Sequence, residues 1–231
     1  MSMSDDPRSE LAAALDALGD TLRFHRDMGV TDLPLDGDYL LGPEQALRAQ
    51  EATLQGCRLC KLCEARNTIV FGSGNPRAEL VVIGEGPGAD EDAQGKPFVG
   101  RAGQLLTKML ESVQLSRDEV YITNTVKCRP PGNRNPEGDE LAACAPVLAG
   151  QLGVLQPKVV LALGSVATQA LLRTKEPIGR LRGKLHPYGD AVLVPTFHPA
   201  FLLRNPGPEY KRMAWDDLKL AKREYDQRRT R

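Results

Sequence analysis

The sequence predicts an α/β fold with three αβα layers around a central four-stranded parallel sheet, preceded by an N-terminal helical extension. Four short apolar runs rich in Val, Ile and Leu have the composition of strands that are buried on both faces. Segments with helical apolar spacing separate these runs. Such an alternation of strands and helices is typical of a doubly wound sheet.

The sequence of the N-terminal part of the chain predicts two helices joined by a linker. Apolar residues at helical spacing predict an amphipathic helix over residues 11–28. Residues 29–43 are rich in Gly, Pro and Asp, as linkers are, and a second short helix is expected over residues 43–54. We therefore expect three parts: an extension with its linker over residues 1–42, the sheet domain over residues 43–224, and a basic tail over residues 225–231.

The strands and helices of the sheet domain follow in order. The expected strands span residues 80–83, 120–123, 159–163 and 191–194, and the expected helices span residues 104–113, 136–155 and 165–172. Parallel strands end at one edge of the sheet, which is where open α/β sheets bind their ligands. Unusual residues follow all four strands, namely Gly84 with Glu85, Asn124, Gly164 and, after a short turn, His198. The functional site is expected at this edge.

Composition places the chain among ordinary globular proteins. Its 231 residues are 41% hydrophobic and 26% charged, and 30 basic residues balance 30 acidic ones. Net charge therefore gives no argument for or against nucleic acid as a partner. No apolar run approaches the ~20 residues that span a bilayer, and the first twenty residues lack the apolar core of a signal peptide. We expect a cytoplasmic protein with reduced thiols and no membrane partner.

Five cysteines in such a protein indicate metal or redox chemistry before disulfides. Cys57 and Cys60 have the spacing that lets two thiolates from one turn bind one metal centre, and Cys128 and Cys144 come much later. Together the four suit either Zn²⁺ or an iron–sulfur cluster, and spacing alone does not decide between them. Buried apolar cysteines are the alternative. Cys63 is an additional thiol with an ambiguous role.

A long irregular loop follows the first expected strand. It carries glycines at positions 84, 86 and 88 and four acidic residues within eight positions. Acid-rich loops suit proton transfer or the positioning of water better than they suit phosphate. A dinucleotide-binding fingerprint is one alternative, although Pro87 and the missing third glycine spacing argue against it. A structural turn with solvated acids is the other.

Taken together, these residues resemble the iron–sulfur uracil-DNA glycosylases, family 4 of the uracil-DNA glycosylase superfamily. The matching stretches are residues 84–88 with Glu91 and Asp92, residues 95–100, Asn124 with residues 126–131, and residues 195–199 with residues 202–205. The resemblance covers about residues 57–221. It implies a monofunctional enzyme of base excision repair that flips uracil out of single- or double-stranded DNA and hydrolyses its N-glycosidic bond.

The resemblance also implies a cofactor and partners. A [4Fe–4S] cluster is expected on Cys57, Cys60, Cys128 and Cys144, with Cys63 outside the ligand set. The protein is expected to act as a monomer. Its N-terminal extension is a candidate contact for a replication or repair protein.

The chemistry of excision suggests roles for the residues after the strands. His198 is expected to donate a hydrogen bond to uracil O2 as charge develops there. Asn124 has an amide that can read uracil O4 and N3–H, and Phe98 offers a face on which the base can stack. The structural alternatives are a hydrogen-bonded core histidine, a loop cap at Asn124 and a plain core phenylalanine.

Two acidic residues are candidates for the activation of water. The better-known branch of the superfamily has an Asp where this chain has Gly86 in the substrate pocket. Glu85 is the first candidate for the role and Glu91 the second. By resemblance, Glu91 also forms the wall near uracil C5.

DNA is expected to be held through its phosphates. Arg129, Arg134 and Arg204 are the candidates, and solvated surface arginines are the alternative. Leu202, or its neighbour Leu203, is expected to wedge into the space that the flipped base leaves.

Two rival functions remain at this point. One is a non-catalytic, cluster-bearing module that binds uracil or single-stranded DNA. The other is a zinc-stabilised hydrolase of free nucleotides.

Overall fold

The computed structural model describes residues 16, 19, 23 and 42–229. The chain divides into two units, Met1–Leu41 and Gly42–Arg231, and the second carries the sheet. The helix expected over residues 11–28 lies outside the described residues, except for three isolated positions that are helical.

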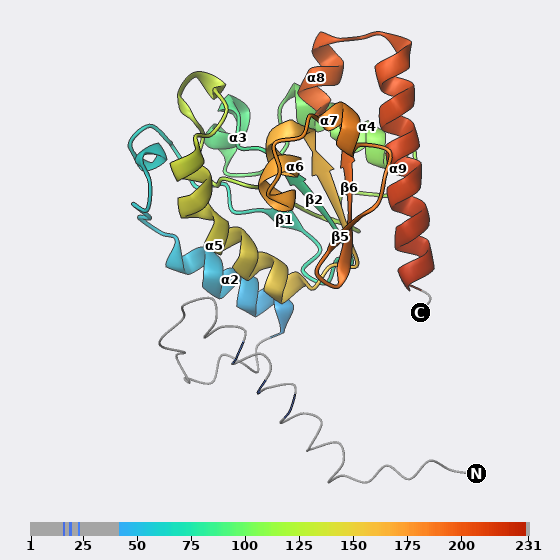
Figure 1. The fold of residues 1–231 in the computed structure, drawn as a ribbon. Coiled ribbons are helices and arrows are strands. Elements are labelled where there is room, and N and C mark those ends of the chain that lie inside the picture. Colours follow the sequence, from blue (N-terminus) through green and yellow to red (C-terminus); the bar gives the residue numbers. More distant parts are fainter. Residues whose placement is uncertain (1–15, 17–18, 20–22, 24–41, 230–231) are drawn as a thin grey trace, which may run out of the picture. The chain divides into compact units, whose positions relative to one another are not determined.

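The described residues form one sheet of six strands in the order β1-β3-β2-β4-β6-β5 (Figure 1). The strands are β1 (Ser73–Gly74), β2 (Leu80–Gly84), β3 (Tyr121–Asn124), β4 (Val159–Leu163), β5 (His186–Tyr188) and β6 (Ala191–Thr196). The four expected strands are the parallel ones. Short antiparallel strands, β1 and β5, are added at the two edges, so the sheet has two more strands than the four parallel ones expected. Strands of two and three residues are too short to show an apolar alternation.

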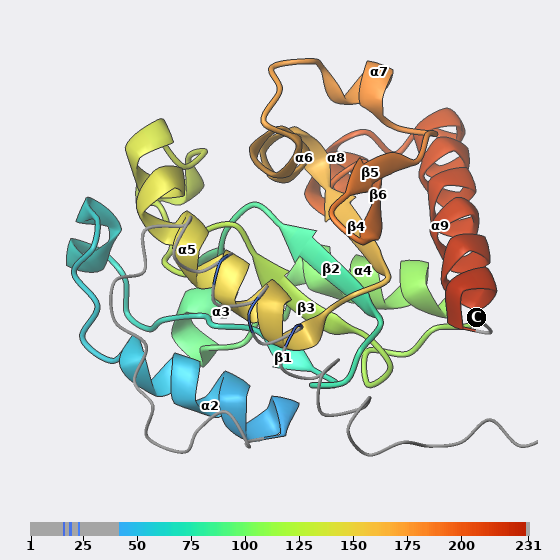
Figure 2. The same cartoon turned by 60° about the horizontal axis from the view of Figure 1, so that its bottom comes forward.

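Helices cover both faces of the sheet, which confirms the α/β fold and its three layers (Figures 1 and 2). One face carries α4 (Arg101–Glu111), α8 (Pro199–Arg204) and α9 (Pro208–Arg229), and the other carries α2 (Pro43–Thr53), α5 (Gly138–Leu155) and α6 (Gly164–Leu172). Shorter elements lie in the loops: α3 (Ala89–Gln94), α7 (Ile178–Leu181) and two 3₁₀ turns at Lys61–Glu64 and Pro131–Asn133.

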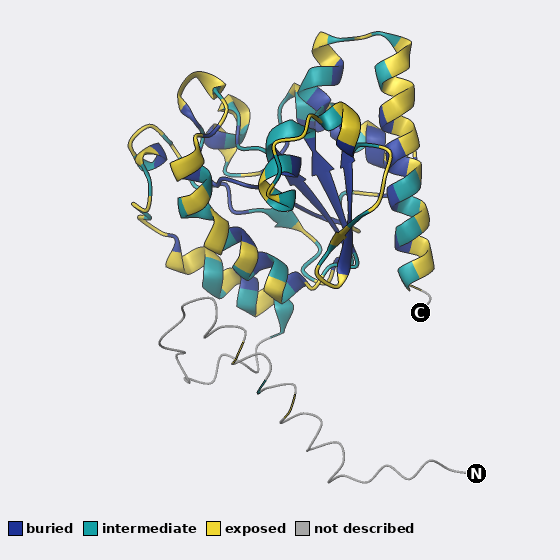
Figure 3. Ribbon diagram, in the orientation of Figure 1, coloured by how far each residue is buried: buried dark blue, intermediate teal, exposed yellow. Residues whose placement is uncertain are grey.

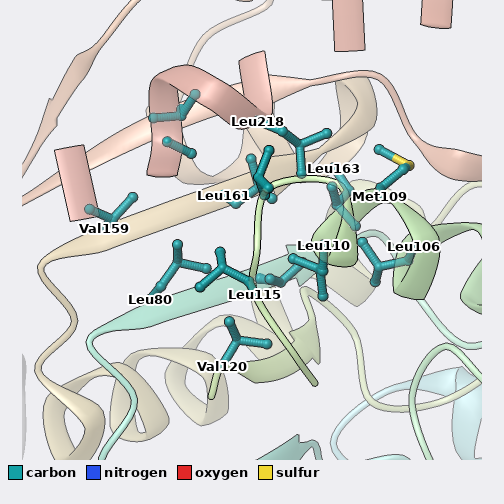
Figure 4. Packing of buried hydrophobic residues seen from close by; sticks show 14 of the residues in the cluster. Leu80, Leu106, Met109, Leu110, Leu115, Val120, Val159, Leu161, Leu163 and Leu218 are labelled. Carbon is teal, nitrogen blue, oxygen red and sulfur yellow. The ribbon is translucent and has the colours of Figure 1, made fainter. Parts of the chain in front are cut away.

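The core consists of two apolar layers that share the strands. Because successive strand side chains point to opposite faces, Leu80 and Val82 pack toward α4 and α9, whereas Val81 and Ile83 pack toward α2 and α5. Figure 3 shows the buried strands between helices with exposed outer faces, and Figure 4 shows the layer beneath α4 and α9. Burial on both faces explains the continuous apolar runs in the sequence.

The last helix, α9, was not predicted. Its inner face includes two alanines and Asp217 beside Leu218 and Tyr225, so its apolar signal is weak. Arg182 on the neighbouring segment donates to the buried Asp217 carboxylate at 2.7 and 2.9 Å. The helix continues across the expected boundary at residue 224, and Tyr225 is buried in the core. Tyr225 therefore packs with the sheet domain, one residue beyond the expected boundary.

No helix in the described part of the chain has the length and apolar character that crossing a bilayer requires.

Candidate active site

The carboxyl ends of β2 and β3 meet at Gly84 and Asn124, which are partners in the sheet register. A Cβ atom at position 84 would lie 2.5 Å from Asn124 Oδ1 and 2.5 Å from Phe98 Cζ. Only glycine permits this approach. The structure thus brings Asn124 and Phe98 together around the end of β2, as expected from the sequence.

The loop that carries Phe98 is held in an unusual backbone conformation. Phe98 has a φ of 54°, a left-handed value that costs a bulky residue of the order of 1–3 kcal/mol. The Arg117 guanidinium donates to the carbonyl oxygens of Pro97 at 2.9 Å and Phe98 at 3.1 Å. These two bonds fix the strained segment from one side.

Glu91 fixes the same loop from the other side. One of its carboxylate oxygens accepts from the backbone N–H groups of Val99 and Gly100, both at 2.9 Å. The other oxygen accepts from Gly88 N at 3.1 Å. A carboxylate with three backbone donors is suited to holding a loop, so the contacts of Glu91 favour positioning over the activation of water.

The His198 ring faces the Phe98 ring, with 5.7 Å between the ring centroids and 34° between their planes. His198 precedes α8, and its Nδ1 accepts from Ala200 N at 3.1 Å. Burial, with a smaller contribution from Arg204, lowers the pKa of His198 to about 4. The imidazole is therefore neutral at pH 7, and its proton is on Nε2 because Nδ1 is an acceptor.

The Asn124 side chain is 1% exposed, and its Oδ1 has no hydrogen-bond partner among the described residues. Buried polar atoms nearly always have a partner, and exceptions are informative. The backbone carbonyl of Asn124, in contrast, accepts from Lys127 Nζ at 2.7 Å. The amide therefore has unused hydrogen-bonding capacity next to Phe98.

Glu85 is the other acidic candidate. Its backbone is anchored to Thr125, whose hydroxyl donates to the Glu85 carbonyl at 2.5 Å. Its carboxylate makes no hydrogen bond within the described chain. Burial raises the pKa of Glu85 above its usual value, and Arg204 opposes the rise. Arg204 thus interacts electrostatically with both Glu85 and His198.

Of the residues expected to contact DNA on α8, some are exposed and one is buried. Leu202 is 3% exposed and packs in the core, so the wedge role expected for it is wrong; Leu203, at 40%, is the exposed neighbour. A helix presents adjacent residues to different faces, and only one of the two can be free. Arg204 is exposed.

The two remaining arginines have protein partners. Arg134 donates at 2.8 and 2.6 Å to the buried Glu140 carboxylate and lowers the pKa of Glu140 to about 2. This pair favours a structural role for Arg134. Arg129 donates to Asn133 Oδ1 at 2.8 Å and is half-buried.

The thiols gather at a second place, away from Phe98. Four of them line one cavity: Cys57, Cys60, Cys128 and Cys144. Cys63 does not line it, and all five cysteines are free thiols. Within residues 42–229, no three His, Cys, Asp or Glu side chains are arranged to hold a single metal ion.

Two cations border the same cavity. Arg66 donates from Nη1 to Cys128 Sγ at 3.2 Å and from Nη2 to the Cys57 carbonyl at 2.7 Å. Lys127 is 2% exposed, and burial lowers its pKa to about 7 while the nearby Cys144 opposes this shift. Burial likewise raises the pKa of the Cys128 thiol to about 11. The described lining thus combines thiols with positive charge and contains no carboxylate.

Comparison with known proteins identifies the family. The model of the uracil DNA glycosylase superfamily matches residues 71–219, which include β1 to β6 and the residues around Phe98. This chain belongs to the uracil-DNA glycosylase superfamily. The resemblance inferred from the motifs is confirmed.

The superfamily relatives are mainly of one type. The type-4 uracil-DNA glycosylase of Saccharolobus solfataricus is 48% identical over 65% of this chain and 74% of its own length. The type-4 enzyme of Thermotoga maritima is 41% identical over 78% of this chain and 94% of its own length. The type-5 uracil-DNA glycosylase of Thermus thermophilus is 33% identical over 62% of this chain and 78% of its own length. These comparisons confirm the predicted similarity to family 4 members.

Sequence reasoning missed two residues of this superfamily site. Arg117 lies in a polar stretch after α4, and only the fold shows that it reaches Pro97 and Phe98. Lys127 lies within the matching stretch of residues 126–131, and that stretch by itself does not indicate its contacts. Its position beside Cys128 and three residues after Asn124 was the available signal.

Proposed function

We propose that this protein removes uracil from DNA by hydrolysing the N-glycosidic bond, leaving an abasic site. The observation that carries the proposal is the buried Asn124 amide, whose Oδ1 lacks a partner beside the Phe98 ring and the neutral His198. The type-4 relatives, which are named for this activity, support it. A base must leave the duplex to reach such a buried group, so base flipping is part of the proposal.

Base recognition follows from the atoms of the amide. Asn124 Oδ1 accepts from uracil N3–H and Nδ2 donates to uracil O4. Cytosine presents an acceptor at N3 and a donor at N4, which is the reverse pattern. Phe98 stacks on the flipped base, and its strained backbone, held by Arg117 and Glu91, fixes the ring position.

Departure of uracil places negative charge on the base. The neutral His198 donates from Nε2 to uracil O2, and the bond strengthens as charge builds. Arg204 adds a positive potential from α8. Such preorganised donors typically contribute ~10²–10³ in rate.

Water attacks the sugar carbon as the base leaves. Glu85 is the group proposed to orient this water and to stabilise the oxocarbenium-like sugar with its negative charge. Its carboxylate, unlike that of Glu91, makes no hydrogen bond to the described chain. Glu91 holds the loop and forms the wall near uracil C5.

The cysteine cavity is the proposed site of a [4Fe–4S] cluster held by Cys57, Cys60, Cys128 and Cys144. The donor set fits such a group: four thiols around one cavity, with Arg66 and Lys127 to balance anionic thiolates. When bound, the cluster cross-links the segment before β1, the loop after β3 and α5.

The proposed DNA contacts are Arg204, Leu203 and Arg129. Arg204 and Leu203 are exposed at the C-terminal end of α8, the helix that begins after His198. This position suits a phosphate contact and an apolar wedge beside a flipped nucleotide.

The test is excision from oligonucleotides that carry a single U, T, hypoxanthine or C, in single and double strands, followed by alkali. Breakage of the U strands is the expected result. Uracil-specific binding without alkali-labile sites would instead favour a non-catalytic module. Iron and sulfide analysis of the same protein tests the cluster separately.

A further inference from the structure

Lys127 is a buried lysine whose three hydrogen bonds use all three N–H donors of the ammonium form, and it has no carboxylate partner in the described protein. Its Nζ donates to Thr123 Oγ1 at 2.6 Å, to the Asn124 carbonyl at 2.7 Å and to Gln151 Oε1 at 2.6 Å. All three acceptors are neutral, and no described carboxylate pairs with the ammonium group. Burial disfavours the charged form of this group, and an anion beside it would stabilise the ammonium that the three hydrogen bonds require.

The other side of Lys127 borders the cysteine cavity. Lys127 lines this cavity with Cys128 and Cys144, and the remaining charged residue of the lining, Arg66, is also basic. An iron–sulfur cluster with four thiolate ligands carries net negative charge and meets this need. Lys127 therefore has the cluster on one side and the end of β3 on the other.

The end of β3 is where uracil is read. Lys127 binds the carbonyl of Asn124 and the hydroxyl of the preceding residue, Thr123. Both belong to the final two residues of the strand, so these bonds determine how the Asn124 side chain enters the pocket. No other described cation touches both places.

We propose that Lys127 is the counter-cation of the cluster and the positioning residue for Asn124, so that it couples the cluster to uracil recognition. This inference rests on the proposed function. The cluster then has two effects: it cross-links the chain segments that carry its ligands, and it influences base binding through the Lys127 side chain.

Arg66 provides a matched comparison. It is a cation beside the same cavity and donates to Cys128 Sγ, but it makes no bond to β3. Replacing either cation by methionine removes one positive charge beside the cluster. Only the replacement of Lys127 also removes the bonds to Thr123 and Asn124.

The experiment compares Lys127→Met, Lys127→Gln and Arg66→Met as holoenzymes. The first two measurements are the iron content per chain and the midpoint reduction potential of the cluster. The third is uracil-specific binding, which is the Kd for an oligonucleotide with one non-cleavable 2′-fluoroarabino-uridine divided by the Kd for the same oligonucleotide with thymidine at that position. All three variants should show a more negative potential, because the oxidised and less negative cluster gains relative stability. Lys127→Met should weaken uracil-specific binding about ten-fold or more, as residues that orient a ligand typically do. Arg66→Met should weaken it less.

Lys127→Gln separates charge from hydrogen bonding and guards against a variant that fails to fold. The amide that this variant introduces can still donate to the Asn124 carbonyl, so Lys127→Gln should bind uracil DNA more tightly than Lys127→Met. Its cluster should keep the more negative reduction potential, because the positive charge is still missing. Folded Lys127→Gln with wild-type iron, potential and Kd would overturn the inference. A Lys127→Met protein that binds uracil no worse than Arg66→Met would overturn the positioning role. Wild-type protein without iron or excision activity would instead refute the proposed function.

Discussion

At the scale of single residues, His198 is the group whose role can be isolated best. His198→Ala should slow single-turnover excision by ~10²-fold or more, because the donor to uracil O2 acts mainly as charge develops. Binding of uracil DNA should change little. The measurement is single-turnover cleavage with thermal melting of the same sample.

His198→Asn is the matched control for the capping role. His198 accepts from Ala200 N at the start of α8, and Asn is also a good acceptor at such a position. If capping were the function of His198, the Asn variant would regain the wild-type rate. Under the proposed mechanism it remains slow, because a shorter side chain does not reach uracil O2.

The pH dependence of excision should come from Glu85 rather than from His198. The imidazole pKa of about 4 keeps His198 neutral as the pH falls from 8 to 5. Burial raises the pKa of Glu85 above its ordinary 4.5, so lowering the pH protonates Glu85 first and removes its negative charge. The single-turnover rate should therefore fall on the acid side, with an apparent pKa above 4.5.

The Glu85→Gln variant checks this assignment. It should be slow at neutral pH and should lack the acid limb. A variant that retains the wild-type acid limb would assign the limb to another group. Thermal melting at each pH separates a loss of activity from a loss of folded protein.

At the scale of elements, the loop between α3 and α4 shows how a strained residue is maintained. Arg117 and Glu91 bind the segment on both sides of Phe98, and a Cβ at Gly103 would lie 1.8 Å from the Phe98 carbonyl oxygen. The strain persists because several contacts determine the conformation together. The loop should therefore be sensitive to the loss of one of them.

Arg117→Met should allow Phe98 to leave its left-handed conformation. We expect a ~10–100-fold loss of single-turnover excision, the range for residues that orient a reacting group through another. Lys108→Met, at an exposed position on α4, is the control and should retain activity. A fully active, well-folded Arg117→Met protein would contradict the role of the guanidinium in holding the loop.

The elements predicted from sequence are those with a strong apolar signal. The four parallel strands are buried on both faces and were found; the edge strands β1 and β5 and the helix α9 have weak signals and were missed. The same limit applies to the site. The convergence of Gly84, Asn124 and Phe98 follows from strand order, whereas the partners of Arg117, Lys127 and Arg134 depend on contacts between distant or irregular segments.

At the scale of the whole molecule, α9 makes the end of the chain part of the core. Tyr225 is 6% exposed and packs in the same apolar layer as Leu80 and Leu218. Tyr225→Ala should lower the free energy of unfolding by about 3 kcal/mol, as truncations of buried aromatic residues do. Arg223→Ala, exposed on the same helix, should change it by less than about 0.5 kcal/mol. Denaturant unfolding of both variants checks the extent of the domain.

The unpartnered Oδ1 of Asn124 has a further consequence for how the proposed pocket chooses its base. A buried acceptor without a donor costs about 1–3 kcal/mol, and uracil relieves this cost through N3–H. Cytosine brings a lone pair at N3 instead, so it would add repulsion between two acceptors to the cost of losing its own water. Discrimination then comes less from attraction to the right base than from the penalty on every base that arrives without a proton at that position.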